Sequence, residues 1–342
     1  MELTKRIDLN LGYTCDLACR FCYYRESRRS PRPKRRRDLT TTEAKKWLRF
    51  FRRRGLEAVD LTGGEPTIRG DILELVNYAR ELGFRTVCVI TNGIRMAEDA
   101  FCRRLAESGL NDVLFSLHGP GPEIHDRLTG TEGSFAKTSR ALENAAGLGF
   151  RLRSNTVVTG VNLQCLEETA DLLHRRGVSR ANFILFNPVV EARNAGGEIA
   201  VRYREAAGPL RRLIEKQEAG FERLTIRYFP LCLLAGLEDR IVNMPRVQCD
   251  PDEWDYLWRS YFRRSLPVWL AAVAGGFFLH PRPRRLLRLN PGTALRESVI
   301  WSIIAVNFLR GAPCRRCRLY PDCGGVWRGY AERFGTEELR PA

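Results

Sequence analysis

Residues 7–22 read IDLNLGYTCDLACRFC, an apolar β-type segment followed at once by a loop with three cysteines. The next β-type segment, residues 58–66, reads AVDLTGGEP and ends in two glycines. A helical pattern separates the two, and the same alternation continues to about residue 187. Strands that alternate with helices in this way are typical of βαβ units and a parallel sheet. The sequence therefore predicts an α/β fold.

Six strands are expected in this part of the chain: Ile7–Leu11, Ala58–Leu61, Thr86–Ile90, Asp112–Leu117, Arg153–Val158 and Ala181–Phe186. Five amphipathic stretches between them predict helices: Thr42–Phe51, Ile72–Leu82, Ala97–Ser108, Phe135–Leu148 and Leu166–Arg176. Six such units favour an incomplete α/β barrel over a closed eight-fold one, with ligands at the carboxyl ends of the strands.

The alternation weakens after Asn187. A helix is expected over Tyr203–Ala219 and a strand over Leu224–Tyr228. We therefore expect a core barrel domain over residues 1–225 and a smaller C-terminal domain over residues 226–342. An apolar and basic insertion, at about residues 250–310, interrupts the second domain.

The net charge of +16 over 342 residues is concentrated in three windows. Arg28–Arg37 holds seven basic residues, and Arg282–Arg288 and Arg310–Arg318 hold four each, without an acidic residue in any of them. Such windows are either solvated surface or a site for an anionic partner, such as nucleic acid or an acidic peptide. Two windows adjoin cysteines, so part of the charge is also expected to stabilise thiolates.

The N-terminal segment Met1–Leu11 is charged and lacks the apolar core of a secretory signal. The longest apolar run, Leu266–Leu279, has 14 residues, whereas about 20 are needed to span a bilayer. We therefore expect a cytoplasmic protein, in which the 11 cysteines are reduced. Metal ligation is then the leading explanation for the closely spaced ones.

Three cysteines, Cys15, Cys19 and Cys22, follow the first strand with the spacing CxxxCxxC. Three thiolates within one short loop can hold a metal cluster without closing a long loop. Three ligands for a four-iron cluster leave one iron open for chemistry. From the spacing alone, half of a structural zinc site is the alternative.

The second strand ends in Gly63-Gly64-Glu65-Pro66, on the same edge of the sheet as the cysteine loop. Paired glycines let the backbone approach a ligand closely, and Glu65 offers a carboxylate that accepts from an ammonium group. Together with CxxxCxxC one strand earlier, this sequence resembles the radical S-adenosylmethionine (radical SAM) superfamily over about residues 5–190. Phe21 before the last cysteine, Thr91-Asn92-Gly93 and Ser116-Leu117-His118 add to the resemblance.

The resemblance implies an incomplete (β/α)6 TIM-like barrel and a [4Fe-4S] cluster held by Cys15, Cys19 and Cys22. It implies that the cluster binds S-adenosylmethionine and cleaves it reductively to a 5′-deoxyadenosyl radical, which abstracts hydrogen from a substrate. The residues implied to bind S-adenosylmethionine are Phe21, Gly63, Gly64, Glu65, Pro66, Asn92, Ser116 and Asn155.

A second cysteine group, Cys314, Cys317 and Cys323, has the spacing CxxCx5C. It resembles the central motif of SPASM domains, although Trp327 stands where that family has a further cysteine. The resemblance implies one auxiliary iron–sulfur cluster in a SPASM- or twitch-like domain. Cys232 is the favoured fourth ligand and Cys249 the alternative, and a structural zinc site is the competing interpretation.

Two further features have two interpretations each. His118 and His125 flank the loop after the fourth strand, where they either take part in proton transfer or fix a turn rich in glycine and proline. The apolar runs Leu266–Leu279 and Val299–Leu309 are expected to be helices packed on a core. An interfacial membrane element or a pocket for an apolar substrate is the alternative.

The sequence thus predicts a radical SAM enzyme that acts on a peptide, natural-product or cofactor precursor. A reductant such as ferredoxin or flavodoxin is an expected partner. A radical SAM enzyme that modifies nucleic acid is the first alternative, and an iron–sulfur or zinc-binding interaction protein is the non-enzymatic one. Contact with nucleic acid or with a membrane surface is not the favoured interpretation.

Overall fold

The structure is a computed structural model that describes residues 2–24, 37–187 and 197–341. The chain divides into two compact units. The barrel unit comprises residues 8–201 and 208–225, and the C-terminal unit comprises residues 1–7, 202–207 and 226–342. Of the basic window Arg28–Arg37, only Arg37 lies within the described residues, where its guanidinium bonds both carboxylate oxygens of Glu43 at 2.7 and 2.5 Å.

One sheet of eight strands runs in the order β1 to β8. The strand pairs from β2 to β6 and the pair β7–β8 are parallel. The strands are β1 Arg6–Asn10, β2 Ala58–Thr62, β3 Thr86–Thr91, β4 Asp112–Ser116, β5 Arg151–Val158, β6 Arg180–Leu185, β7 Arg223–Arg227 and β8 Ile241–Val242. All six strands expected in the first half of the chain are present within two residues of their expected bounds, which confirms the incomplete α/β barrel.

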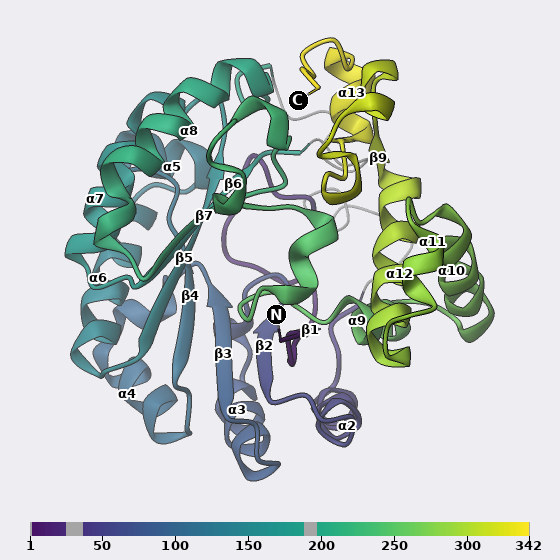
Figure 1. Ribbon diagram of the computed structural model, residues 1–342. Helices are drawn as coiled ribbons and strands as arrows, with labels where there is room; N and C mark the ends of the chain where they lie inside the picture. Colours follow the sequence, from purple (N-terminus) through teal and green to yellow (C-terminus); the bar gives the residue numbers. More distant parts are fainter. Residues whose placement is uncertain (1, 25–36, 188–196, 342) are drawn as a thin grey trace. The chain divides into compact units, whose positions relative to one another are not determined.

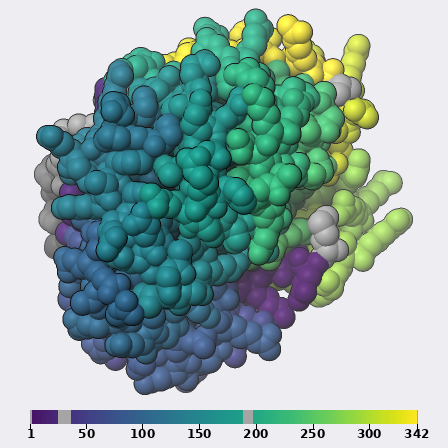
Figure 2. Space-filling model, turned by 90° about the vertical axis from the view of Figure 1, so that its left-hand side faces the viewer, coloured from purple at the N-terminus to yellow at the C-terminus, as the bar shows by residue number. Residues whose placement is uncertain are grey.

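Figure 1 shows helices on the outer side of the curved sheet of the barrel unit, and Figure 2 shows their outer face as a layer of side chains. Each helix buries one stripe against the strands, as with Leu75, Val76 and Ala79 of α3. The helices from the start of the chain are α2 Thr41–Arg52, α3 Ile72–Glu81, α4 Asp99–Glu107, α5 Pro122–Thr129, α6 Ser134–Gly147, α7 Leu166–Arg175 and α8 Tyr203–Gln217.

Helix α5 (Pro122–Thr129) was not expected from the sequence. Gly119-Pro120-Gly121-Pro122 is typical of a turn, but Pro122 occupies the first turn of the helix, where its missing N–H costs nothing. The helix ends at Gly130 in the left-handed conformation, with φ 67°. His125 therefore belongs to a helix rather than to a loop.

A fully buried arginine crosses the interior of the barrel unit. The Arg153 side chain on β5 is 1% exposed, as are the side chains of Asp112 on β4 and Asp60 on β2. Its guanidinium lies 2.8 Å from Asp112 and 3.4 Å from Asp60, and it also bonds the sulfur of Cys88 at 3.2 Å. A buried charge needs such partners, so this group fixes the relative positions of four strands.

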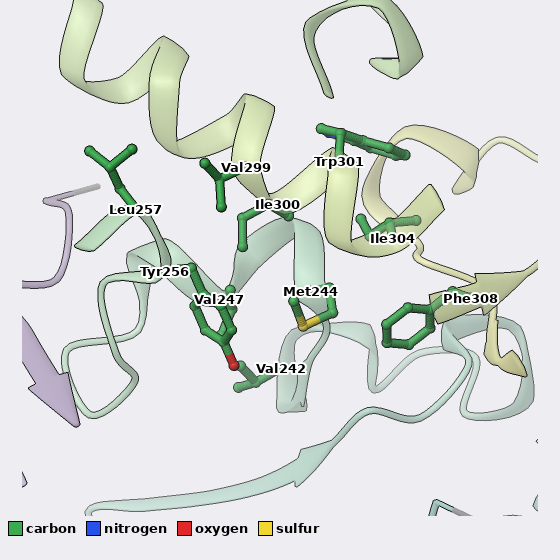
Figure 3. Packing of buried hydrophobic residues seen from close by; sticks show 10 residues of the cluster. All are labelled: Val242, Met244, Val247, Tyr256, Leu257, Val299, Ile300, Trp301, Ile304 and Phe308. Atoms are coloured by element: carbon green, nitrogen blue, oxygen red, sulfur yellow. The ribbon is translucent and has the colours of Figure 1, made fainter. Parts of the chain in front are cut away.

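The C-terminal unit has a core of its own, shown in Figure 3, in which Val299, Ile300, Trp301 and Ile304 of α12 pack against residues 242–257. Its helices are α9 Tyr256–Arg263, α10 Leu266–Leu279, α11 Pro283–Leu286, α12 Pro291–Asn307 and α13 Arg328–Phe334, and a small sheet pairs β9 Phe308–Leu309 with β10 Val326–Trp327.

Both expected helices in this region pack on the core, α12 through a fully buried face and α10 through the partly buried Trp269 and Val273. Six residues of α12 are buried, whereas Gly276 is the one buried residue of α10. No helix among the described residues is both long and apolar enough to cross a membrane.

Candidate functional site

The loop with Cys15, Cys19 and Cys22 begins where β1 ends and is held by backbone hydrogen bonds. The Gly64 N–H donates to the Gly12 carbonyl at 2.9 Å, and the Glu65 N–H donates to the Thr14 carbonyl at 2.8 Å. These bonds join the cysteine loop to the loop after β2. All three cysteines are half-buried, on a loop whose main chain these bonds fix.

Gly63 and Gly64 make this contact possible because neither has a side chain. A Cβ atom at Gly64 would lie 2.0 Å from the Thr14 carbonyl oxygen, and one at Gly63 would lie 2.4 Å from the Gly12 carbonyl oxygen. Gly63 also has φ 138°, which strains any other residue. The two glycines are therefore required for the two loops to pack, whatever they bind.

The other end of the cysteine loop rests on α5. The Arg20 N–H donates to the Leu128 carbonyl at 2.9 Å, and the Ala18 N–H donates to the Thr129 carbonyl at 3.2 Å. The side chains of Arg20 and Arg127 both form ion pairs with Glu198. The loop is thus anchored at both ends by segments that are distant in sequence.

Glu65 is buried, with 3% of its surface exposed, and its carboxylate accepts four hydrogen bonds. Oε1 accepts from the Thr67 N–H at 3.0 Å, the Thr67 hydroxyl at 2.6 Å and the Thr91 hydroxyl at 2.8 Å. Oε2 accepts from the Asn92 N–H at 2.7 Å. Burial raises the pKa of Glu65, while the four donors oppose this shift. Because Oε2 has one donor, it retains capacity for a second.

Asn92 extends this network to the cysteine loop. Its side-chain amide donates to Asp16 at 2.7 Å, and Asp16 follows Cys15 directly. A second carboxylate, Asp38, accepts from the Tyr13 N–H and from the Thr14 hydroxyl, each at 2.6 Å. Sequence analysis did not single out Asp16 or Asp38, and it named Thr91 only within Thr91-Asn92-Gly93 and not as a site residue. Of these residues, Asp16 could most easily have been predicted from the sequence, because it is an acidic residue between the candidate ligands Cys15 and Cys19.

Ser116 and Asn155 are neighbours across β4 and β5, and both are half-buried at the carboxyl end of the sheet. The Asn155 oxygen accepts from the Asn182 amide at 2.9 Å, and the Asn182 oxygen accepts from the Thr225 hydroxyl at 2.8 Å. A row of polar side chains therefore runs across strands β4 to β7 of the barrel unit.

Phe21 packs edge to face on the ring of His118, with 4.6 Å between the ring centroids. His118 Nδ1 accepts from the Val157 N–H, and His125 Nδ1 accepts from the His118 N–H, each at 3.2 Å. Burial lowers the pKa of both histidines, well below the usual value for His118 and to about 4 for His125. Both rings are therefore neutral and accept hydrogen bonds from backbone N–H groups, as expected of residues that fix a turn. A role in proton transfer stays a prediction.

A second constellation lies within the C-terminal unit. Cys232, Cys314, Cys317 and Cys323 line one cavity together with Arg310 and Tyr320, and Cys249 is not among its lining residues. Burial raises the pKa of Cys232 to about 11, and the other three cysteines add to this shift. Four thiolates in one cavity would repel one another. A bound cationic group would stabilise their charged form.

Arg310 lies beside this cavity. Its guanidinium donates to the Cys323 carbonyl at 2.9 Å and stacks on the rings of Tyr320 and Trp301, at 4.2 and 4.9 Å from their centroids. Its field favours thiolates in the cavity. None of the 11 cysteines, all of which lie in the described ranges, forms a disulfide. The described residues contain no group of three His, Cys, Asp or Glu side chains arranged to hold a single metal ion.

Comparison with known proteins gives consistent results for the barrel unit. Residues 9–173 match the sequence model of the radical SAM superfamily. Mycofactocin maturase MftC of Mycolicibacterium smegmatis is 37% identical over 172 residues, which are 49% of this chain and 41% of the relative. The AdoMet-dependent heme synthase of Oleidesulfovibrio alaskensis is 30% identical over 194 residues, 56% of this chain and 48% of the relative. The chain therefore spans about half the length of these relatives or less.

Two solved structures share the fold over nearly the whole chain. Native anSMEcpe with bound AdoMet has a TM-score of 0.60 at 18% identity and covers 98% of this chain and 92% of that one. SuiB of Streptococcus suis bound to S-adenosylmethionine has a TM-score of 0.60 at 15% identity, over 99% of this chain and 77% of that one. With a matching sequence model over the barrel, CxxxCxxC after β1 and GGEP after β2, this chain belongs to the radical SAM superfamily.

Proposed function

We propose that this chain is an enzyme that holds a [4Fe-4S] cluster on Cys15, Cys19 and Cys22. The observation that carries the proposal is the packing of the cysteine loop on the Gly63-Gly64 loop through the bonds at Gly64 and Glu65. When bound, the cluster supplies the electron that cleaves S-adenosylmethionine, which generates a 5′-deoxyadenosyl radical that abstracts hydrogen from a substrate. Three cysteines leave one iron open for the cosubstrate.

The rim residues bind and orient the cosubstrate in this proposal. Gly63, Gly64 and Pro66 present backbone at the contact between the two loops, with no side chain on the glycines. Glu65 Oε2 has capacity for an ammonium N–H and holds Asn92 in place. Phe21 offers an aromatic face for the adenine, and Ser116 and Asn155 offer polar groups at the adjoining strand ends.

The four cysteines of the C-terminal cavity are proposed to hold an auxiliary iron–sulfur cluster, with one sulfur for each iron. Cys232 rather than Cys249 is the proposed fourth ligand, because it lines the cavity with Cys314, Cys317 and Cys323. Arg310 would compensate the negative charge of a cluster with four thiolates. This arrangement supports a SPASM- or twitch-like role for the domain.

The proposed substrate is a peptide or a small-molecule precursor of a cofactor. Relatives named as a mycofactocin maturase and as a heme synthase support this class. The protein is proposed to work in the cytoplasm, where cysteines stay reduced and can serve as thiolate ligands. The electron is proposed to come from a reduced carrier in that compartment, such as ferredoxin or flavodoxin.

Anaerobic reconstitution tests both clusters. The wild-type chain should bind about eight irons, and the variants C15A/C19A/C22A and C314A/C317A/C323A should each bind about four. With dithionite and S-adenosylmethionine, the wild type should form 5′-deoxyadenosine and the first variant should not. About four irons in the wild type would disprove the auxiliary cluster. Absence of 5′-deoxyadenosine from the iron-loaded wild type would disprove the proposed reaction.

A further inference from the structure

Nearly all the large apolar side chains that are exposed in the described part of the chain lie in one segment. Of nine such side chains, only Tyr23 lies elsewhere. The other eight belong to residues 266–307, which form α10, α11 and α12 and are called the apolar hairpin here: Leu266, Val268, Leu270, Phe278, Leu279, Leu287, Leu295 and Val306. Exposed apolar residues are ordinarily scattered, so this concentration indicates a contact surface.

The inner face of α10 packs closely on α12 and on the core of the C-terminal unit. A Cβ atom at Gly276 would lie 1.7 Å from the Ser298 carbonyl oxygen, so α10 approaches the backbone of α12 as closely as a glycine allows. Trp269 and Val273 pack on the core of the C-terminal unit, and the Trp269 indole donates to the Leu257 carbonyl at 3.4 Å. The helix is therefore fixed in place by one face.

The outer face of α10 is apolar where a surface helix ordinarily carries charge. Pro267, Leu270, Ala271, Ala274 and Phe278 follow one another at helical spacing, and all are exposed. Phe278 is 79% exposed and Leu270 is 53% exposed. No residue from Leu266 to Leu279 carries a charge. The helix is about 20 Å long at 1.5 Å per residue, which is too short to cross a bilayer but suits a helix that lies in its surface.

The charges around this face have one sign. Residues 256–296 contain no Asp or Glu and eight arginines. Arg282, Arg284, Arg285 and Arg288 are exposed in the short segment that joins α10 to α12, on both sides of Leu287, which is 74% exposed. The acidic residues on either side of this stretch are paired with it: Glu297 with His280 and Arg285 at 3.1 and 3.5 Å, and the buried Asp255 with Arg296 at 2.7 Å.

We propose that the apolar hairpin docks on the surface of an anionic lipid bilayer. The outer face of α10 enters the boundary between headgroups and acyl chains, and the arginines of residues 282–288 lie among the lipid phosphates. The apolar face of α10 matches the acyl chains of the bilayer, and the arginines beside it match the anionic headgroups. A second copy of the chain fits less well, because its symmetric contact would bring two sets of arginines together.

Flotation of the full chain with lipid vesicles tests the proposal. Vesicles of phosphatidylcholine with about 30 mol% phosphatidylglycerol should bind the protein at low salt, and pure phosphatidylcholine should bind it weakly or not at all. Each arginine near an anionic surface contributes about fivefold to affinity. The variant R282S/R284S/R288S should therefore bind about a hundredfold more weakly, whereas R53S/R54S/R85S, which removes three exposed arginines from the barrel unit, should bind as the wild type does.

The variant F278D tests the apolar contact separately. Because Phe278 is 79% exposed, this variant should fold with an unchanged thermal midpoint and still lose vesicle binding. Three results would overturn the proposal: no flotation of the wild type with anionic vesicles, flotation that survives in both hairpin variants, or a dimer in sedimentation velocity that F278D dissociates. The third result would assign the face to a second copy.

Discussion

The change Glu65→Gln tests whether this carboxylate acts as a structural brace of the rim. Three donors converge on Oε1, so the amide oxygen of glutamine should take that place. The amide nitrogen then faces the Asn92 N–H, at a position where the native separation is 2.7 Å. Two donors would meet there, and the buried Asn92 N–H would lose its acceptor.

The size of the effect follows from this geometry. The lost charge-assisted bond contributes about 1.5–3 kcal/mol, and an unsatisfied buried N–H costs about 1–3 kcal/mol. Glutamine no longer requires burial of a charge, which offsets part of the loss. We expect a net decrease of about 2 kcal/mol in the free energy of unfolding. For a unit of about 200 residues, this corresponds to a thermal midpoint lower by about 4–8 °C.

The assay is differential scanning fluorimetry of the protein without iron, followed by calorimetric titration of S-adenosylhomocysteine into the iron-loaded protein. Thr67→Val is the matched control, since it removes one hydroxyl donor from Oε1, leaves the Thr67 N–H in place and keeps the charge. It should lower the midpoint by a smaller amount. If Glu65→Gln left the midpoint within about 1 °C of the wild type, the brace would be refuted. Lost ligand binding at an unchanged midpoint would then assign Glu65 to direct contact.

Three further predictions concern the barrel unit. Arg153→Met should lower the free energy of unfolding by about 3–5 kcal/mol in chemical denaturation, because it removes the buried guanidinium that Asp60 and Asp112 share. Arg151 still lies 3.2 Å from Asp112, so adding Asp60→Asn should restore part of this loss. A single variant as stable as the wild type would contradict the assignment. Gly64→Ala places a Cβ atom 2.0 Å from the Thr14 carbonyl oxygen and should reduce iron loading from about eight to about four per chain, whereas Gly147→Ala, whose Cβ meets nothing within 4 Å, should keep both clusters. His125 stays neutral to about pH 4 in the folded protein, while an unfolded histidine binds a proton below about pH 6.5, so unfolding takes up a proton in that window. Stability should therefore fall as the pH drops from 6.5 toward 4, by up to about 3 kcal/mol, and His125→Asn should flatten this dependence in thermal scans; an unchanged slope would contradict it.

Most strands and helices of the barrel could be predicted from the sequence, because the pattern that specifies each of them lies within a short segment. Apolar segments predicted the strands, and amphipathic stretches predicted the helices between them. Helix α5 was missed because Gly119-Pro120-Gly121-Pro122 satisfies the rules for a turn as well as those for the first turn of a helix. Tertiary contacts distinguish the two: α5 bonds the cysteine loop through Leu128 and Thr129, and its Asp126 accepts hydrogen bonds from the start of α6.

In the candidate sites too, local motifs could be predicted from the sequence, whereas contacts between distant residues could not. CxxxCxxC and GGEP are short motifs, and the strand order brings them to one edge. The bonds of Glu65 with Thr91 and Asn92 join two strands, so spacing could not reveal them. The spacing CxxCx5C and the favoured Cys232 came from the sequence, but their meeting in one cavity brings together residues 82 positions apart, which only the fold determines.

Arg310 connects the two features of the C-terminal unit. It lines the cysteine cavity and stacks on Trp301, a residue of α12 within the apolar hairpin. The same guanidinium therefore belongs both to the packing of α12 and to the lining of the cavity. Replacing it would remove a packing contact and a positive charge beside four sulfur atoms in a single change.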